Sequence, residues 1–466
     1  MKKIIIITFI LLFSIAGFSQ DIEGSWNGKA ESGKSGPVIF NFRIQKNGEN
    51  YITIIDIPSI RVANLKPKQT TFTNGELLVD GSNLGFTFQG KLRQDSQQIE
   101  GTFTEGVNAL PLQLIKSAIK IENTFSRPQE PVKPYPYEEE EIMFSNKKAG
   151  VTLAGTLTLP NKTGVFPVVI LISGSGPQDR DETFYTHKPF LVLADYLTRQ
   201  GIAVLRYDDR GAGKSTGDHS AATTKDLASD VMSAIAYLAS RNDIDGKKIG
   251  LIGHSEGAII APMVANLNKK ISFIVMLGGT GIPGSEVSLY QAKKMRGFPV
   301  QDETAYESAV RKAIEIASAN KDVTDIKKEL KAHYNETIMP MIKPMFKSDA
   351  EAAEVIDKLI EMRTSAWSRY FNTYNPANEL EKVTCPVLAL NGSKDTQVQP
   401  KINQEAIQNA LAKGDSKDYT VKELPNLNHL FQACETGEMN EYNKIEQTIS
   451  PLLLTQISDW ILVRVK

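Results

Sequence analysis

Short stretches of alternating apolar and polar residues fill the first quarter of the chain. Residues 38–44 alternate in this way, with the period of a half-buried β-strand. Asn47-Gly48 then favours a hairpin turn because both residues tolerate positive φ, and residues 51–55 form the predicted return strand. Further turn pairs lie at Asn74-Gly75, Asp80-Gly81 and Asp95-Ser96. Residues 20–118 are therefore predicted to be a small all-β domain, a barrel or a sandwich.

The pattern changes after residue 138, where continuous apolar runs alternate with amphipathic segments. The apolar runs lie at 168–172, 202–205, 249–252, 273–277 and 387–390, and residues 419–424 form a further strand-like stretch. Residues 189–199 and 225–241 have the spacing of helices between such runs. Uninterrupted apolar strands alternating with helices predict an α/β fold, with a parallel sheet covered on both faces, over residues 138–466.

Residues 281–380 interrupt this rhythm with several predicted helices and no predicted strand. The segment separates two core strands, so it has to leave the sheet and return to it. Insertions at the carboxyl ends of parallel strands lie over the ligand-binding crevice, which favours a helical lid. The alternative is an additional packing domain without a catalytic role.

The junction between the two regions is rich in proline. Four prolines lie in residues 126–137, and proline removes backbone donors and favours extended polyproline conformation. We therefore expect a linker over residues 119–137.

The N-terminus has the three-part layout of a secretory signal peptide. Lys2 and Lys3 precede an apolar run over residues 4–16, and small residues follow at 17–19. Residues 1–19 are therefore predicted to be a signal peptide cleaved near Ser19 and Gln20, which implies an exported, periplasmic or secreted protein. The alternative is a membrane anchor, but a spanning helix needs about 20 apolar residues. No stable membrane span is expected after cleavage.

Charge and cysteine content exclude several classes of function. The 466 residues hold 53 Lys and Arg against 54 Asp and Glu, so the chain lacks the basic footprint of a nucleic-acid-binding protein. Cys385 and Cys434 form no CxxC pair, which gives no sign of a structural zinc site. We expect them to stay separate because they lie toward opposite ends of the sheet. No metal or organic cofactor is expected.

The strongest chemical signal is Gly253-His254-Ser255-Glu256-Gly257, which fits the G-x-S-x-G motif. It lies between a predicted strand and a predicted helix, as a nucleophile elbow requires. Ser255 is therefore the predicted nucleophile. The alternative is a glycine-rich turn with an incidental serine.

A serine nucleophile needs a base to remove its proton, and this fold presents serine, acid and histidine in that order along the chain. His429 follows a predicted strand, whereas His333 lies within the helical insertion. Asp395 directly follows the strand at 387–390 and is the predicted acid, which would orient the imidazole. Asp415 and Asp418 are rival carboxylates in a polar loop.

An oxyanion hole needs two backbone donors. We assign one to the amide of Glu256, directly after the nucleophile. The second is assigned to Ser175, with Gly174 as the near alternative, in the loop after residue 172. A simple tight turn is the competing interpretation of this loop.

Several other polar and apolar groups admit two interpretations. Charged residues at 178–181 and 206–210 could contact substrate, but ion pairs that fix loops are favoured. The side chain of His254 is expected to point away from Ser255. Met339, Met341, Met345 and Phe346 could line an acyl pocket, although helix packing is favoured.

Residues 138–466 resemble a known family. GSGPQDRDET, the stretch from HKPFLVLADY to KSTG, GHSEGA, PVLALNGSKDTQV and LNHLFQ are similar to bacterial α/β-hydrolases grouped with EstD-type esterases and serine aminopeptidases. The resemblance implies a triad of Ser255, Asp395 and His429 and carboxylesterase activity, usually on short acyl esters. Ala258 departs from the more frequent GHSEGG. Residues 21–118 resemble the small β domain found ahead of such hydrolases in Bacteroidetes.

Three functions remain open at this point. The favoured one is a carboxylesterase that acts on a small ester through an acyl-enzyme. The second is a serine aminopeptidase or peptidase with the same triad, in which lid carboxylates such as Glu351, Glu354 or Glu361 would bind a free amine. The third is a binding module with an inert hydrolase region, against which the complete triad argues. The oligomeric state stays open.

Overall fold

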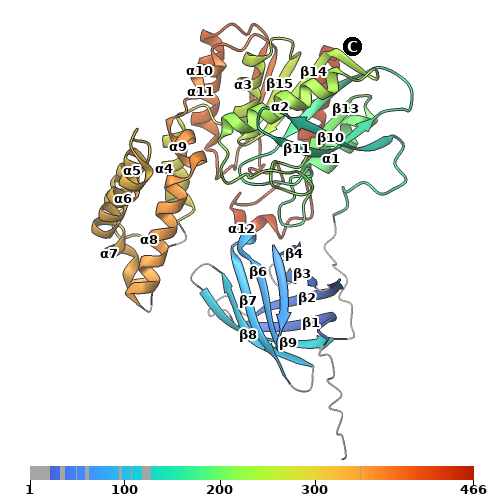
Figure 1. The fold of residues 1–466 in the computed structure, drawn as a ribbon. Coiled ribbons are helices and arrows are strands. Elements are labelled where there is room, and N and C mark those ends of the chain that lie inside the picture. The colour runs from blue at the N-terminus through green and yellow to red at the C-terminus, as the bar shows by residue number, and fades with distance from the viewer. Residues whose placement is uncertain are drawn as a thin grey trace, which may run out of the picture. The chain divides into compact units, whose positions relative to one another are not determined.

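The computed structural model describes residues 21–31, 37–48, 50–57, 62–93, 97–105, 108–117, 127–296, 298–346 and 348–465. The chain divides into two compact units, 1–123 and 124–466, and each is described by itself (Figure 1). The expected signal peptide, the Asp95-Ser96 turn and residues 119–126 of the expected linker lie outside the described residues.

The first unit is a closed antiparallel β-barrel. Its strands are β1 (Gly24–Glu31), β2 (Pro37–Asn47), β3 (Asn50–Ile57), β4 (Val62–Leu65), β5 (Gln69–Thr73), β6 (Glu76–Gly81), β7 (Phe86–Leu92), β8 (Gln98–Glu105) and β9 (Asn108–Ser117). Within the described residues the order is β2-β1-β9-β8-β7-β6-β5-β3, and β3 pairs again with β2, which closes the ring. The strand β4 pairs with β3. Of the two architectures expected from the sequence, the barrel is the one formed.

Aromatic side chains fill the barrel interior. Along β7, buried and exposed positions alternate without interruption, as the two faces of a barrel strand require. Phe40 lies 4.6 Å from Phe103, and Phe42 lies 5.2 Å from Phe88, measured between ring centroids. Trp26 is fully buried beside them. The barrel therefore has a hydrophobic core of its own.

The second unit is built on a mixed sheet. Its strands are β10 (Glu138–Asn146), β11 (Val151–Leu159), β12 (Phe166–Ile172), β13 (Ala203–Tyr207), β14 (Ile244–His254), β15 (Phe273–Leu277), β16 (Val387–Gly392) and β17 (Tyr419–Leu424). Their order is β10-β11-β13-β12-β14-β15-β16-β17. The strands from β13 to β17 are parallel, but β10 and β11 are antiparallel. The parallel strands predicted from residue 168 onward are confirmed, and the antiparallel hairpin of β10 and β11 before them was not predicted.

Helices cover both faces of this sheet. They are α1 (Pro189–Arg199), α2 (Thr224–Ala239), α3 (Gly257–Leu267), α11 (Pro400–Lys413) and α13 (Pro451–Val465), and the short α12 (Met439–Tyr442) lies in the segment before α13. Alternate residues of β12 join two different cores, one with α2, α3 and α11 and the other with α1 and α13. This arrangement is the α/β-hydrolase fold that the sequence predicts.

The insertion between β15 and β16 is helical, as expected. It contains α4 (Gly284–Lys294), α5 (Glu303–Ala317), α6 (Val323–Thr337), α7 (Met339–Ile342), α8 (Asp349–Thr364), α9 (Ala366–Thr373) and α10 (Ala377–Leu380). It has its own apolar core, against which Met339, Met341 and Phe346 pack, while Met345 is exposed. In the part of the chain that the structure describes, no helix has the length and apolar content to span a membrane.

Two further expectations concern the linker and the cysteines. Residues 127–137 belong to the second unit, where the side chain of Gln129 donates to the carbonyl of Ile449 at 2.7 Å and accepts the amide of Thr448 at 2.7 Å. This part of the expected linker is thus fixed to the hydrolase unit. Cys385 and Cys434 are both free and only half-buried.

Candidate active site

Ser255 lies on a sharp turn at the carboxyl edge of the sheet. It follows the end of β14 at His254 and precedes α3, which begins at Gly257. Its φ is 53°, a left-handed value that is uncommon for a residue with a side chain. Its amide donates to the carbonyl of Leu277 at 2.8 Å, at the end of β15. The turn is therefore held in a strained conformation by the adjacent strand.

The two glycines of the motif are required by close packing. A Cβ on Gly253 would lie 2.0 Å from the carbonyl oxygen of Gly257, and one on Gly257 would lie 2.1 Å from that of Ile172. Neither position can hold a side chain without moving backbone. The spacing of the motif thus follows from a tight strand-to-helix turn, as expected for a nucleophile elbow.

Asp395 and His429 form a buried pair. The Oδ2 atom of Asp395 lies 2.7 Å from Nδ1 of His429, and both side chains are at most 5% exposed. The other oxygen, Oδ1, accepts the amides of Gln397 and Val398, each at 2.8 Å. The carboxylate is fixed by these bonds and places the imidazole proton on Nδ1, which leaves Nε2 as a proton acceptor.

Ser255 and His429 lie at the same edge of the sheet, because each contacts one of two consecutive residues at the end of β15. A Cβ on Gly278, the residue after Leu277, would lie 3.1 Å from Cε1 of His429, and Leu277 holds the amide of Ser255. Within the described residues no hydrogen bond joins the Ser255 hydroxyl to the His429 imidazole. Such bonds often tighten only when substrate binds.

The expected oxyanion donors differ in availability. The amide of Glu256 lies at the N-terminus of α3, where backbone donors and the helix dipole favour negative charge. Ser175 is exposed, on the loop after β12. The amide of Gly174, however, donates to Oε1 of Glu182 at 2.7 Å. Gly174 is therefore corrected as the near alternative, because its donor is already satisfied by a buried carboxylate.

A second buried carboxylate supports the same loop. The hydroxyl of Ser173 donates to both oxygens of Asp209 at 2.9 Å, and the amide of Gln178 donates to Oδ2 at 3.1 Å. Burial raises the pKa of Asp209 well above its ordinary value. These contacts fix the backbone that carries Ser175.

Sequence reasoning missed two polar groups beside the elbow. Glu182 pairs with Nδ1 of His254 at 2.8 Å, and Nε2 of His254 lies 3.0 Å from the carbonyl oxygen of His429. The partners of the His254 side chain are thus Glu182 and the backbone of His429, and neither contact was predicted from the sequence. The buried carboxyl of Glu256 accepts the indole N–H of Trp367, from α9, at 2.7 Å. Burial raises the pKa of Glu256 above its ordinary value.

The rival residues have other partners. Asp418 pairs with Arg464 at 2.7 Å, and Nε2 of His333 lies 2.8 Å from the carbonyl of Ala309. Glu354 and Glu361 form exposed ion pairs with lysines, and Glu351 lies in the first turn of α8.

The charged stretches form ion pairs that fix loops, as favoured above. The pairs are Arg180 with Asp208, Arg206 with Asp181 and Arg210 with Asp230.

Comparison with known families decides the assignment. Residues 149–415 match the model of the X-Pro dipeptidyl-peptidase family, S15. The matched segment includes Ser255 and Asp395 and ends before His429. The chain belongs to the S15 family. This S15-family protein is also 27% identical to "Esterase EstD" of Thermotoga maritima over 334 residues, which are 71% of this chain and 69% of the relative. The predicted relationship to EstD-type α/β-hydrolases is confirmed.

Solved structures were compared as well. The esterase Pf2001 of Pyrococcus furiosus aligns with a TM-score of 0.45 and 15% identity, over 74% of this chain and 99% of that one. Est1E of Butyrivibrio proteoclasticus, in a structure with ferulic acid, aligns with a TM-score of 0.42 and 15% identity, over 70% and 99%.

Proposed function

We propose that this S15-family protein is a serine hydrolase that cleaves carboxylic esters, with Ser255 as the nucleophile. The observation that carries the proposal is the buried pair of Asp395 and His429, joined at 2.7 Å, on the sheet edge that also holds the strained turn of Ser255. A fixed imidazole with an accepting nitrogen, at the same sheet edge as a half-buried serine on a strained turn, is the arrangement that acyl transfer needs.

The mechanism follows from these positions. Nε2 of His429 removes the hydroxyl proton of Ser255 while the oxygen attacks the ester carbonyl, and Asp395 stabilises the imidazolium that forms. The amides of Glu256 and Ser175 stabilise the oxyanion. His429 then gives its proton to the leaving alcohol, and an acyl-enzyme remains. Water, deprotonated by the same imidazole, hydrolyses the acyl-enzyme and releases the acid.

Replacing the nucleophile tests this function. Ser255→Ala should abolish hydrolysis of p-nitrophenyl acetate and labelling by a fluorophosphonate probe, because both need the serine oxygen. Ser240→Ala, at the exposed end of α2, is the matched control and should keep both. Undiminished hydrolysis by Ser255→Ala would contradict the proposal.

A second function, peptide hydrolysis with the same residues, is favoured by the S15 match. Comparing kcat/KM on p-nitrophenyl esters with that on Xaa-Pro and aminoacyl p-nitroanilides separates the two. We expect the esters to be the better substrates, since the relative covering most of this chain is an esterase. Faster cleavage of the anilides would favour the peptidase.

We also propose that the protein is exported after cleavage near Ser19. The support is the layout of residues 1–19, with two lysines before an apolar run. N-terminal sequencing of the protein recovered from a periplasmic or secreted fraction tests this, and a retained Met1 would contradict it.

A further inference from the structure

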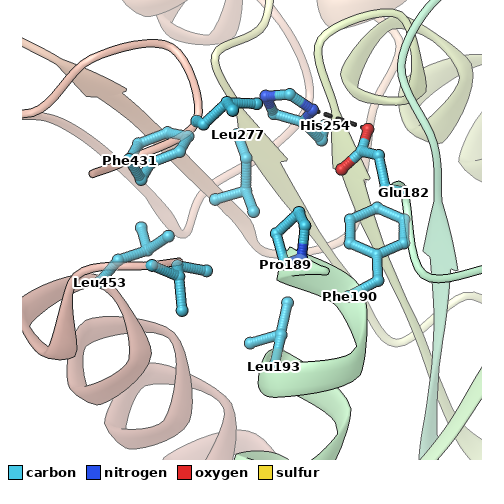
Figure 2. A pocket seen from close by; sticks show the side chains of 10 residues that line it. Glu182, Pro189, Phe190, Leu193, His254, Leu277, Phe431 and Leu453 are labelled. Atoms are coloured by element: carbon cyan, nitrogen blue, oxygen red, sulfur yellow. Dashed lines mark hydrogen bonds and ion pairs between the residues drawn. The ribbon is translucent and has the colours of Figure 1, made fainter. Parts of the chain in front are cut away.

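A buried pair of titratable side chains lies directly beside the elbow. Glu182 comes from the loop after β12, and His254 is the last residue of β14. Oε1 of Glu182 lies 2.8 Å from Nδ1 of His254, and the two side chains are 6% and 9% exposed (Figure 2). Apolar side chains, among them Phe190, Leu193 and Phe431, line the pocket around the pair. Two charged groups in such surroundings are costly unless each is fully bonded.

Each end of the pair holds a different part of the site. Oε1 of Glu182 also accepts the amide of Gly174 at 2.7 Å, one residue before the proposed oxyanion donor Ser175. Nε2 of His254 lies 3.0 Å from the carbonyl oxygen of His429, and the two imidazole rings are 4.8 Å apart. A continuous series of hydrogen bonds therefore connects the loop that carries Ser175 with the backbone carbonyl of His429.

The hydrogen bonds of the two ring nitrogens of His254 determine how many protons the ring carries. A carbonyl oxygen accepts only, so Nε2 must carry a proton to bond to His429. Nδ1 must also carry a proton to bond to a carboxylate. A neutral imidazole has one N–H, so with an ionised Glu182 both bonds form together only in the imidazolium.

The surroundings of His254 support this charge. Burial lowers the pKa of His254, but attraction to Glu182, its hydrogen bond and the carbonyl of His429 outweigh that effect. Attraction to Asp395 acts in the same direction. The pKa of His254 therefore lies above its ordinary value. The neighbouring ring of Phe431, with its centroid 6.4 Å away, adds no charge.

We propose that Glu182 and His254 are positioning residues, and that the His254 imidazolium holds the backbone of His429 and, through Glu182, the backbone of Gly174. The proposal rests on the proposed function of Ser255 and His429. His254 itself does not exchange a proton with substrate. The pair sets where the base and the oxyanion loop lie relative to the nucleophile, and a small misplacement of these groups is costly to turnover.

Two substitutions of His254 distinguish positioning from packing. The side-chain amide of His254→Gln reaches the place of Nε2 and can still donate to the carbonyl of His429. The shorter His254→Asn reaches only the place of Nδ1. We expect kcat on p-nitrophenyl acetate to fall by about 10- to 100-fold in His254→Asn with little change in KM, and clearly less in His254→Gln. Equal kcat in the two variants would overturn the proposal.

Glu182→Gln removes the charge and keeps the shape. Without the carboxylate, His254 is expected to be neutral and to carry a single N–H. It can then donate either to the new glutamine oxygen or to the carbonyl of His429, so one hydrogen bond of the series is lost. In the wild type the complete series of hydrogen bonds persists until the pH rises through the raised pKa of His254. The alkaline fall of kcat should therefore move to lower pH in Glu182→Gln. Glu329→Gln, which breaks an exposed ion pair with Lys321, is the control and should leave the profile unchanged.

A spectroscopic measurement tests the charge without any assay of turnover. In ¹⁵N NMR of the folded wild type at pH 6, below the ordinary pKa of histidine, both ring nitrogens of His254 should be protonated, and in Glu182→Gln only one. His254→Asn assigns the signals among the five histidines. A single protonated nitrogen in the wild type would overturn the proposal. Absence of esterase activity in the folded wild-type protein would instead contradict the proposed function.

Discussion

At the scale of single residues, the role of Asp395 depends on its complete set of hydrogen bonds. One oxygen accepts two amides and the other contacts His429, so the carboxylate has a fixed orientation relative to the imidazole. Asp395→Asn keeps the shape but presents the wrong hydrogen-bonding group to Nδ1, which favours the unproductive tautomer. We expect kcat for ester hydrolysis to fall by about 10⁴-fold.

Asp418→Asn is the matched control for this substitution. Its carboxylate pairs with Arg464 and is about half exposed, and exposed pairs contribute little. Its kcat should stay near that of the wild type. A comparable loss in Asp418→Asn would transfer the role of the acid to the rival residue.

The sequence predicts the nucleophile, acid and base because chain order and strand ends constrain them. Ser255, Asp395 and His429 each follow a predicted strand at the same sheet edge. Glu182 has no such signal, because its partner His254 is 72 residues away and the loop between β12 and α1 is irregular. Gly174 was proposed as an oxyanion donor because its glycine pattern shows where the backbone can approach a substrate. The pattern does not show that another acceptor already binds the Gly174 amide.

At the scale of elements, α9 connects the helical insertion to the elbow. Trp367 donates to the carboxyl of Glu256, and Thr224 of α2 donates to the same oxygen at 2.7 Å. Phe371, one turn further along α9, packs in the sheet core. The insertion is therefore hydrogen-bonded to Glu256, the residue after Ser255. The position of the insertion should affect the stability of that turn.

Trp367→Phe removes the indole donor and keeps an aromatic ring. The loss should lower the free energy of unfolding by about 1–3 kcal/mol, since a buried acceptor loses a partner. The donor bonds the ionised carboxylate more strongly than the acid. Because burial raises the pKa of Glu256 above its ordinary value, the loss should be smaller below that pKa and grow as pH rises through it. Urea unfolding at pH 5 and pH 8 checks this.

Trp460→Phe on α13 is the control for the indole proton. The Nε1 atom of Trp460 is buried without a partner within the described residues, so its removal should give a loss that does not grow with pH. Equal pH dependence in the two variants would contradict the assigned role of Trp367.

The elements themselves were mostly predictable, because hydrophobic periodicity decides them. Residues 189–199, 273–277 and 419–424 have the predicted bounds in α1, β15 and β17. The hairpin of β10 and β11 was missed since its edge strand begins with four glutamates, a pattern that also suits a solvated loop. The contacts of residues 127–137 with the hydrolase unit were not predicted, because proline content describes local backbone and not the tertiary contacts that Gln129 makes.

At the scale of the whole molecule, two units with separate cores share one chain. The barrel has a closed ring of strands and an interior of aromatic side chains, while the hydrolase unit contains all the residues proposed for catalysis. The ring closes through the pairing of β2 with β3, and its apolar core lies inside it, so this core needs no second unit to cover it. The two units should therefore fold independently.

Residues 124–466 expressed alone should consequently form an active hydrolase. We expect kcat on p-nitrophenyl acetate to stay within about twofold of the full chain, since domains with separate cores fold alone. A shorter fragment that starts at residue 150 is the control, because it lacks β10, which pairs with β11 along its full length. It should lose stability by thermal unfolding. A large loss of kcat in the fragment 124–466, with its fold intact by circular dichroism, would show that the barrel contributes to the site.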